Sequence, residues 1–208
     1  MRTINCPSCG AEGRIDNPAS VSYTCPYCDN IVLFDKEGLK LSGKSSRLSE
    51  GFSRLYRGAT GAIDGKRFYI LGRVRYSFGR GFWDEWLLDI GEDEPVWLTE
   101  DNYELSLQSP YDLANPPAIN KLKVGKNISL RGLKFRIQES GKAKCIGIEG
   151  ELPRSILPDE EYLYVDGSSL DGKYSFGIEF DDDLKPACYI GTWLTQDKLV
   201  MDENDYGW

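Results

Sequence analysis

Histidine is missing from the 208-residue sequence, and no long apolar run occurs in it. Without histidine, the chain cannot form a Ser-His-Asp triad, a Cys-His dyad or a metal site with an imidazole ligand. Without a run of about 18 apolar residues, no segment is expected to cross a bilayer as a helix. The phosphate-loop pattern G-x4-G-K-[ST] and a strand-linked G-x-G-x-x-G are also lacking, which disfavours a nucleotide-binding enzyme.

Basic side chains are too few to balance the acidic ones, 25 against 33, so the formal net charge is −8. This excess of negative charge disfavours non-specific binding to nucleic acid and direct binding to anionic lipid. The beginning, MRTINCPSCG, lacks the apolar stretch of a signal peptide. We therefore expect a protein of the reducing cytoplasm, with no direct membrane insertion, which a partner would bring to a membrane if it acts there.

Four of the six cysteines form two C-x2-C pairs, Cys6-Pro-Ser-Cys9 and Cys25-Pro-Tyr-Cys28, which are separated by 15 residues. Two such pairs can surround one ion with four thiolates, and zinc is the usual metal for four sulfur ligands. A set of four cysteines leaves no position for water. The sequence therefore predicts a structural Zn²⁺ site in a zinc ribbon, with an iron–sulfur centre or a redox dithiol as alternatives.

After the ribbon, short alternating runs follow one another between glycine-rich turns, which is typical of antiparallel sheets. In the segment 66–76, the side chains of Phe68, Ile70, Val74 and Tyr76 fall on one face at period two. We predict an all-β fold, in which two small antiparallel β-barrel-like (SH3-like) modules follow the ribbon. The predicted boundaries are 1–34 for the zinc ribbon, 35–50 for a linker, 51–114 and 119–196 for the two β modules, and 197–208 for an acidic tail.

The two predicted modules share a motif. The pattern G-x6-G-x2-F-x-I begins at Gly58 and recurs 67 residues later at Gly125. The recurrence indicates an internal duplication, although a glycine-rich β chain also produces some such matches by chance.

Charge changes sign abruptly inside the first module. Residues 51–80 contain seven basic side chains and one acidic one, whereas residues 81–110 contain nine acidic side chains and no basic one. Two interpretations stay open: the charges pair across adjacent strands, or they form a polar binding site beside tryptophan. In the predicted strand 82–90, period-two alternation places Trp86 on the same face as apolar neighbours and therefore in the core. Trp83 and Glu85 fall on the other face. The candidate binding residues are Arg73, Arg75, Trp83, Glu85, Trp86, Glu149 and Glu151.

The motifs C-P-S-C-G-A, C-P-Y-C, G-R-V-R-Y, W-D-E-W-L-L, V-W-L-T-E and G-I-E-G-E-L-P occur in this order between residues 3 and 195. Together they resemble an uncharacterised bacterial family, domain of unknown function 4178, preceded by its zinc ribbon. The resemblance implies no activity. It implies a cytoplasmic accessory of a membrane-stress or envelope-linked system, because family members are encoded beside polyamine-synthesis-like and membrane-remodelling proteins. The family's motif positions here are Trp83, Glu85, Trp86, Trp97, Glu149, Gly150, Glu151 and Leu152.

Three functions fit these observations. The leading hypothesis is a non-enzymatic protein-interaction module, an adaptor of a bacterial membrane-stress or polyamine-linked system with a protein partner. The second is a carboxylate-based binder or enzyme for a polyamine-like cation, using Glu85, Glu149 and Glu151. The third is nucleic-acid binding through the ribbon and the basic segment 51–80, which the net charge opposes. The sequence leaves the oligomeric state open, and enzymatic activity is not expected.

Overall fold

The computed structural model of the protein describes residues 1–36, 38–49, 53–113, 115–181 and 183–202. Strands dominate these residues. Their helical segments are two 3-10 turns, η1 at Ile119–Lys121 and η2 at Gln196–Lys198. The predicted all-β fold is therefore confirmed. Within the described ranges, no helix has the length and apolar character needed to cross a bilayer.

Sixteen strands follow one another along the described chain. The N-terminal strands are β1 (Arg2–Asn5), β2 (Glu12–Ile15), β3 (Ser22–Thr24), β4 (Asn30–Asp35) and β5 (Gly38–Ser45). The next are β6 (Thr60–Ile63), β7 (Lys66–Ser77), β8 (Phe82–Asp89), β9 (Val96–Asp101) and β10 (Glu104–Pro110). The last are β11 (Asn127–Leu130), β12 (Leu133–Leu152), β13 (Glu161–Ser169), β14 (Tyr174–Phe180), β15 (Pro186–Leu194) and β16 (Leu199–Met201).

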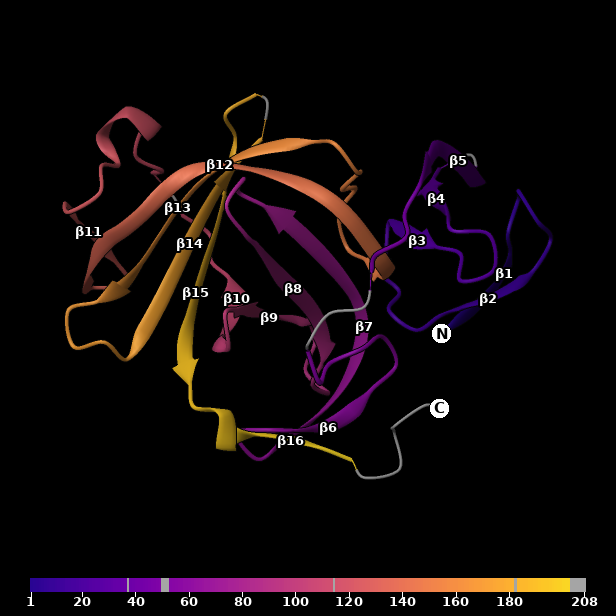
Figure 1. The fold of residues 1–208 in the computed structure, drawn as a ribbon, viewed down its shortest axis with the longest axis horizontal. Coiled ribbons are helices and arrows are strands. Elements are labelled where there is room, and N and C mark those ends of the chain that lie inside the picture. Colours follow the sequence, from indigo (N-terminus) through magenta and orange to yellow (C-terminus); the bar gives the residue numbers. More distant parts are fainter. Residues whose placement is uncertain (37, 50–52, 114, 182, 203–208) are drawn as a thin grey trace.

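Eight antiparallel strands close into a ring (Figure 1). Their order is β7-β8-β9-β10-β15-β14-β13-β12, and β12 returns to pair with β7. We call β7–β10 the first half-ring and β12–β15 the second half-ring. The half-rings join through β7 with β12 and through β10 with β15. The prediction of two separate small barrels is corrected here, because each predicted module supplies half of one ring.

The predicted repeat corresponds to two hairpins with the same register. β6 pairs with β7 and β11 pairs with β12, and each pair in the first hairpin has its counterpart 67 residues later in the second. The Gly58 N–H donates to the Ile70 carbonyl at 2.9 Å, and the Gly125 N–H donates to the Ile137 carbonyl at 2.8 Å. Both glycines have positive φ, 87° and 84°, a conformation that costs glycine little.

Each half-ring packs its outward face against its own hairpin. Alternate strand residues point to opposite faces, so an apolar outward face leaves the intervening residues for the lumen. The first outer cluster contains Leu55, Ala59, Ile63, Phe68, Ile70, Trp86, Leu88, Val96, Leu98, Leu105 and Leu199. The second contains Leu122, Leu130, Phe135, Ile137, Val165, Phe176, Ile178, Phe180, Cys188 and Ile190. A third cluster, including Val74, Tyr76, Leu87 and Cys145, fills one end of the ring itself.

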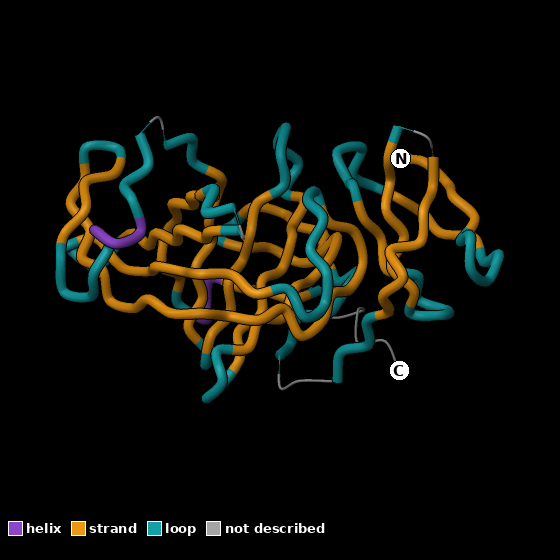
Figure 2. The backbone as a smooth tube through the Cα atoms, turned by 90° about the horizontal axis from the view of Figure 1, so that it is seen from above, coloured by secondary structure: helices purple, strands orange, loops and turns teal. Residues whose placement is uncertain are grey.

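The N-terminal module, residues 1–45, lies beside the ring in both views (Figures 1 and 2). β1 and β2 form a hairpin, and β3, β4 and β5 extend the sheet from the end of β12. Ile4, Ile15, Tyr23 and Val32 form its small core. The prediction that residues 35–50 are a linker is wrong for residues 38–45, which form β5 and pair with β4.

One long strand, β12, runs from Leu133 to Leu152 in the second half, with a register shift after Ile137. This length allows β12 to pair with β11 and β13 at one end and with β7 at the other. In the predicted acidic tail, β16 pairs with β6, and residues 203–208 lie outside the described part of the chain.

Candidate functional site

The four cysteines predicted as metal ligands lie together in the N-terminal module. Their sulfur atoms all lie within 4.8 Å of one another. The Sγ atoms of Cys6 and Cys28 are 3.7 Å apart, and those of Cys9 and Cys25 are 3.8 Å apart. Four sulfurs at about 2.3 Å from one tetrahedral ion are separated by about 3.8 Å. The spacing therefore fits one metal ion.

Two turns of the same design hold these cysteines. The Gly10 N–H donates to the Cys6 carbonyl at 2.8 Å, and the Asp29 N–H donates to the Cys25 carbonyl at 2.9 Å. Gly10 and Asp29 each directly follow a cysteine pair and have φ of 77° and 59°. A left-handed residue thus ends both turns. Because all four ligand positions are cysteine, a tetrahedral ion here has no open coordination position for substrate or water.

Glu151, one of the candidate binding residues, joins the module to the ring. Its carboxylate accepts hydrogen bonds from the backbone N–H groups of Asp16 at 2.8 Å and Asn17 at 3.0 Å, and from the Ser20 hydroxyl at 2.9 Å. Glu151 is only 3% exposed. Its position is therefore internal, and it contributes to docking of the module and not to an open surface.

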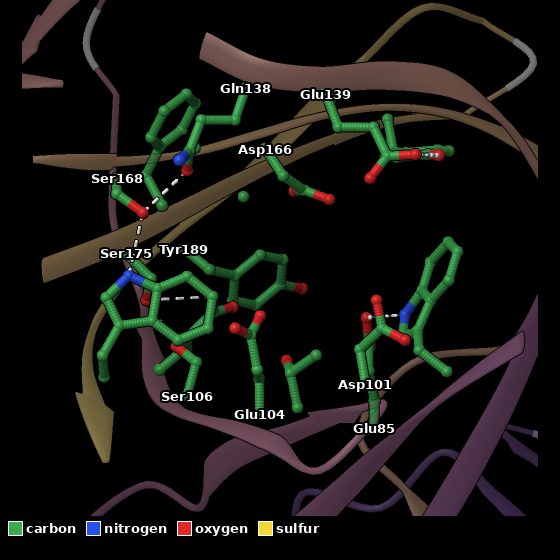
Figure 3. Close-up of a pocket in the computed structure, with 18 of the residues that line it drawn as sticks. Glu85, Asp101, Glu104, Ser106, Gln138, Glu139, Asp166, Ser168, Ser175 and Tyr189 are labelled. Atoms are coloured by element: carbon green, nitrogen blue, oxygen red, sulfur yellow. Dashed lines mark hydrogen bonds between the residues drawn. The ribbon is translucent and has the colours of Figure 1, made fainter. Parts of the chain in front are cut away.

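The ring encloses a cavity of about 530 Å³ (Figure 3). The cavity lies beyond the apolar cluster that fills the other end, and β8, β9, β10, β12, β13, β14 and β15 all contribute to its wall. This volume falls in the range of pockets that hold small molecules. Lining residues on the strands alternate with residues of the outer clusters, as in β13, where Tyr164 and Asp166 line the cavity and Val165 packs outward.

Six carboxylates line this cavity, and no lysine or arginine is among the described lining residues. They are Glu85, Asp101, Glu104, Glu139, Asp166 and Glu179. Figure 3 shows Asp101 and Glu104 on one side of the space and Glu139 and Asp166 on the other. Since the four belong to β9, β10, β12 and β13, the negative charge is spread around the lumen.

Three of the six carboxylates have protein partners. The Trp83 indole N–H donates to Glu85 at 3.1 Å, and the Tyr164 hydroxyl donates to Glu139 at 2.9 Å. Glu179 forms an ion pair of 2.7 Å with Arg154. Each of these carboxylates is therefore held in one orientation.

The other three, Asp101, Glu104 and Asp166, form no hydrogen bond or ion pair with the residues that the structure describes. Burial, followed by the nearby carboxylates of Glu179, Glu139 and Asp101, raises the pKa of Asp166 to about 8. Burial and the charge of Glu179 likewise raise the pKa of Glu85 to about 8. The free cavity thus holds protons at neutral pH that ordinary aspartate and glutamate would release.

Aromatic rings and neutral polar groups complete the wall. The Trp83 ring lies 5.2 Å from the Tyr164 ring, measured between centroids. At the other side, the Trp193 indole N–H donates to the Ser168 hydroxyl at 2.9 Å, and that hydroxyl donates to the Gln138 side chain at 2.7 Å. Aromatic faces beside carboxylates form surroundings that stabilise an organic cation.

The structure separates the residues that the sequence combined into one polar site. Trp83 and Glu85 line the cavity. Arg73 and Arg75 lie on the opposite face of the sheet, where both form ion pairs with buried Asp84, at 2.9 Å and 2.8 Å. The interpretation of charge pairing across adjacent strands is confirmed for these two arginines. Their guanidinium groups are buried, so they are not available to a nucleic-acid phosphate.

Two further candidates also lie away from the cavity. Trp86 is fully buried in the first outer cluster, as its period-two position predicted. Glu149 lies 3.6 Å from Arg73 on the outside of the ring. Neither side chain lines the cavity.

Sequence reasoning missed Asp101, Glu104, Glu139, Asp166 and Glu179. A local signal did exist, because polar residues alternate with apolar ones in segments such as Tyr162–Ser168. That alternation was compatible with a solvent-exposed face. Only closure of the ring turns the polar faces of seven strands toward one another.

These features define the class of protein: an all-β ring with a polar, acidic lumen and an attached four-cysteine module. The family model for a domain of unknown function (DUF4178) matches residues 57–208, and the chain belongs to that family. The match spans the whole ring and leaves out the cysteine module. No curated protein and no solved structure matches the chain.

Proposed function

We propose that the ring binds a small organic cation of the amine class in its lumen. The observation that carries this proposal is a cavity with six lining carboxylates, three of them unpartnered among the described residues, and no lining lysine or arginine. Glu85 and Asp166 are strongly desolvated, so ionising either of them is costly unless a positive charge or hydrogen bonds compensate it. A protonated amine supplies both the charge and the N–H donors.

The distribution of the carboxylates favours an organic cation over a metal ion. Among the described residues, the four cysteines are the only group of three or more potential ligands close enough to share one ion. The cavity carboxylates lie on separate strands, so they suit a cation with several N–H donors or several charges. Trp83, Tyr164 and Tyr189 offer aromatic faces to its methylene groups.

Binding of the amine would release protons from cavity carboxylates. In the free protein, Glu85 and Asp166 have raised pKa values of about 8, mainly because they are buried. A bound ammonium group favours the ionised forms and lowers both pKa values. Affinity should therefore increase as the pH rises from 6 to 8, and binding at neutral pH should release protons to the buffer.

For the module, we propose zinc as the ion held by Cys6, Cys9, Cys25 and Cys28. The support is the sulfur spacing together with the preference of zinc for tetrahedral thiolate sites. Such an ion would stabilise a module whose own core contains few apolar residues. Cobalt substitution tests the geometry, because four tetrahedral thiolates give a characteristic visible spectrum.

The ligand proposal is tested by isothermal titration calorimetry with 1,4-diaminobutane and with 1,4-butanediol, which has the same length and no charge. The diamine should bind and release protons, as shown by heats that differ between buffers of different ionisation enthalpy. The diol should not bind. No heat from the diamine at millimolar concentration at pH 8 would refute the proposal.

Two substitutions locate the site. Asp166→Asn removes an unpartnered cavity carboxylate and should weaken diamine binding at least tenfold, or about 1.4 kcal/mol. Glu94→Gln removes an exposed carboxylate outside this cavity and should leave affinity unchanged. Equal weakening in both variants would indicate attraction by net charge alone.

A second function, protein interaction, is proposed for the module. Tyr27 lies in the second cysteine turn and is 73% exposed, which suits a contact residue on a rigid, metal-held turn. The setting inferred from the family resemblance is a cytoplasmic adaptor of a bacterial membrane-stress or polyamine-linked system. Cross-linking in the native host tests it, because one specific partner should be recovered with wild type and much less with Tyr27→Ser. Equal recovery with both proteins would contradict a contact at Tyr27.

A further inference from the structure

One positive charge of the chain reaches the cavity carboxylates from the end of the ring. Arg154 lies between β12 and β13, and its Nη1 atom is 2.7 Å from the Glu179 carboxylate. Its Nη2 atom lies 3.9 Å from Glu85 and donates to the Tyr76 hydroxyl at 3.3 Å. One guanidinium group is thus shared between two cavity carboxylates on different half-rings.

Aromatic rings surround the same guanidinium. Its central carbon lies 5.8 Å from the ring centres of both Trp97 and Tyr189. The Arg154 Nε atom is buried without a hydrogen-bond partner. Carboxylates and aromatic faces around a partly desolvated cation are the surroundings that we propose for an amine ligand. At this end of the lumen, the chain supplies that cation itself.

The main chain of Arg154 is fixed by the cysteine module. Its carbonyl accepts a hydrogen bond from the Ser22 hydroxyl at 3.4 Å, and the Leu152 carbonyl accepts one from the Val21 N–H at 2.9 Å. Ser22 also pairs with Leu152 across β3 and β12. The guanidinium therefore projects from a segment anchored on both sides, by the module and by the ring.

We propose that Arg154 is a specificity-determining residue that fills one of the cation positions of the lumen. This inference rests on the proposed function. With Glu85 and Glu179 compensated by Arg154, an incoming amine binds at the carboxylates that lack partners, Asp101, Glu104 and Asp166. The lumen then accepts short amines and gives little advantage to long polyamines, whose additional ammonium groups have no free carboxylate pair at the Arg154 end.

The test compares the affinities of 1,4-diaminobutane and spermine for the full chain by calorimetry at pH 8. Arg154→Met removes the charge and keeps an unbranched side chain, so it frees Glu85 and Glu179 for a further ammonium group. The ratio of spermine affinity to diamine affinity should rise at least tenfold. Arg154→Lys keeps the charge and should keep the ratio within threefold of wild type. Arg47→Met, at an arginine whose side chain is 86% exposed and which follows the module, should leave the ratio unchanged.

An unchanged ratio in folded Arg154→Met, or equal loss of both ligands, would overturn the inference and leave the amine site in place. If wild type binds neither amine, the proposed function and this inference are both refuted. Repulsion between Glu85 and Glu179 is strong enough that the single variant needs a check by circular dichroism. If it does not fold, the double variant Arg154→Met with Glu85→Gln removes that repulsion, and its spermine preference should still exceed that of wild type.

Discussion

The two half-rings are built on the same plan but differ in the connection between their first two strands. Each begins with a hairpin of the same register, continues as four antiparallel strands and buries its own outer cluster. The first two strands of the first half-ring are joined by a short turn around Gly79, from Ser77 to Phe82. The corresponding connection of the second half-ring, residues 153–160, carries Arg154 and contacts the module.

This difference teaches which parts of the molecule serve the fold and which serve the site. The shared elements form the wall and the outer clusters. On their own, they would make the two ends of the lumen alike. The longer connection makes the lumen asymmetric, because, among the described residues, a guanidinium group pairs with cavity carboxylates at one end only. Four predictions test this comparison: three on stability, from the largest expected effect to the smallest, and one on its pH dependence.

Removing the proposed metal ion should affect the two half-rings differently. Chelation under reducing conditions should unfold the module. It removes an ion that contributes about 10–16 kcal/mol in comparable small sites and leaves four thiolates close to one another. The ring should stay folded. Amide hydrogen exchange should accelerate at the end of β12 and in residues 153–160, which contact the module. Equal acceleration in β8 and β9 would show that the module supports both half-rings alike.

Substitution of matched core rings tests whether the half-rings unfold together. Phe68 and Phe135 occupy equivalent positions of the two hairpins and are 3% and 0% exposed. Phe68→Ala and Phe135→Ala should each cost about 3–5 kcal/mol in the free energy of unfolding. Because β7–β12 and β10–β15 pairing joins the half-rings, both variants should lower the same single denaturation transition. Two transitions, each sensitive to one variant, would contradict a single cooperative ring.

A smaller effect is expected at the hairpin turns. Gly65 and Gly132 are 67 positions apart, have φ of 80° and 75°, and have open space where a Cβ atom would be placed. Alanine at each position should cost about 1–2 kcal/mol, because a side chain disfavours the left-handed conformation. Urea denaturation should give similar losses for the two variants. A loss at only one of them would show that the hairpins do not contribute equally.

The last prediction concerns pH. Asp166 has a raised pKa of about 8 in the folded protein, mainly because it is buried, so between its unfolded pKa of about 3.9 and 8 the native state binds the extra proton. Its contribution to stability is present at low pH and is lost as the pH rises toward 8. Without ligand, the Tm of Asp166→Asn minus the Tm of wild type should therefore increase from pH 5 to pH 8.5, because only wild type loses this contribution. A constant difference would indicate an ordinary pKa for Asp166.

Local chemistry explains what the sequence could predict. The spacing of Cys6, Cys9, Cys25 and Cys28 alone predicts four clustered sulfur atoms, because each pair needs only one tight turn. Period-two alternation placed Trp83 with Glu85 and separated both from Trp86, which the structure confirms. The repeat of glycines indicated an internal duplication, and it corresponds to two hairpins of the same register. Each of these inferences depends on patterns within short stretches of the chain.

The closure of the ring could not be read from local pattern. β7 meets β12 and β10 meets β15 across about 70 to 90 residues, and no local signal specifies such partners. The same reason explains the errors. One of the two interpretations combined Arg73 and Arg75 with Glu85 in a polar site, because the choice between Asp84 and Glu85 depends on the register of β7 with β8. Glu151 was a candidate binding residue, yet it contacts the module.

The shared plan of the half-rings has a consequence for how such a site can evolve. A half-ring alone has two open edges, so a chain of that length would close the same ring only by pairing with an identical copy. Every carboxylate of its lumen would then occur twice, and no connection could change without its mate changing too. Covalent fusion of the two copies removes that restriction. It lets a single lumen acquire one arginine, one docking glutamate and one metal-binding appendage, each on one side only.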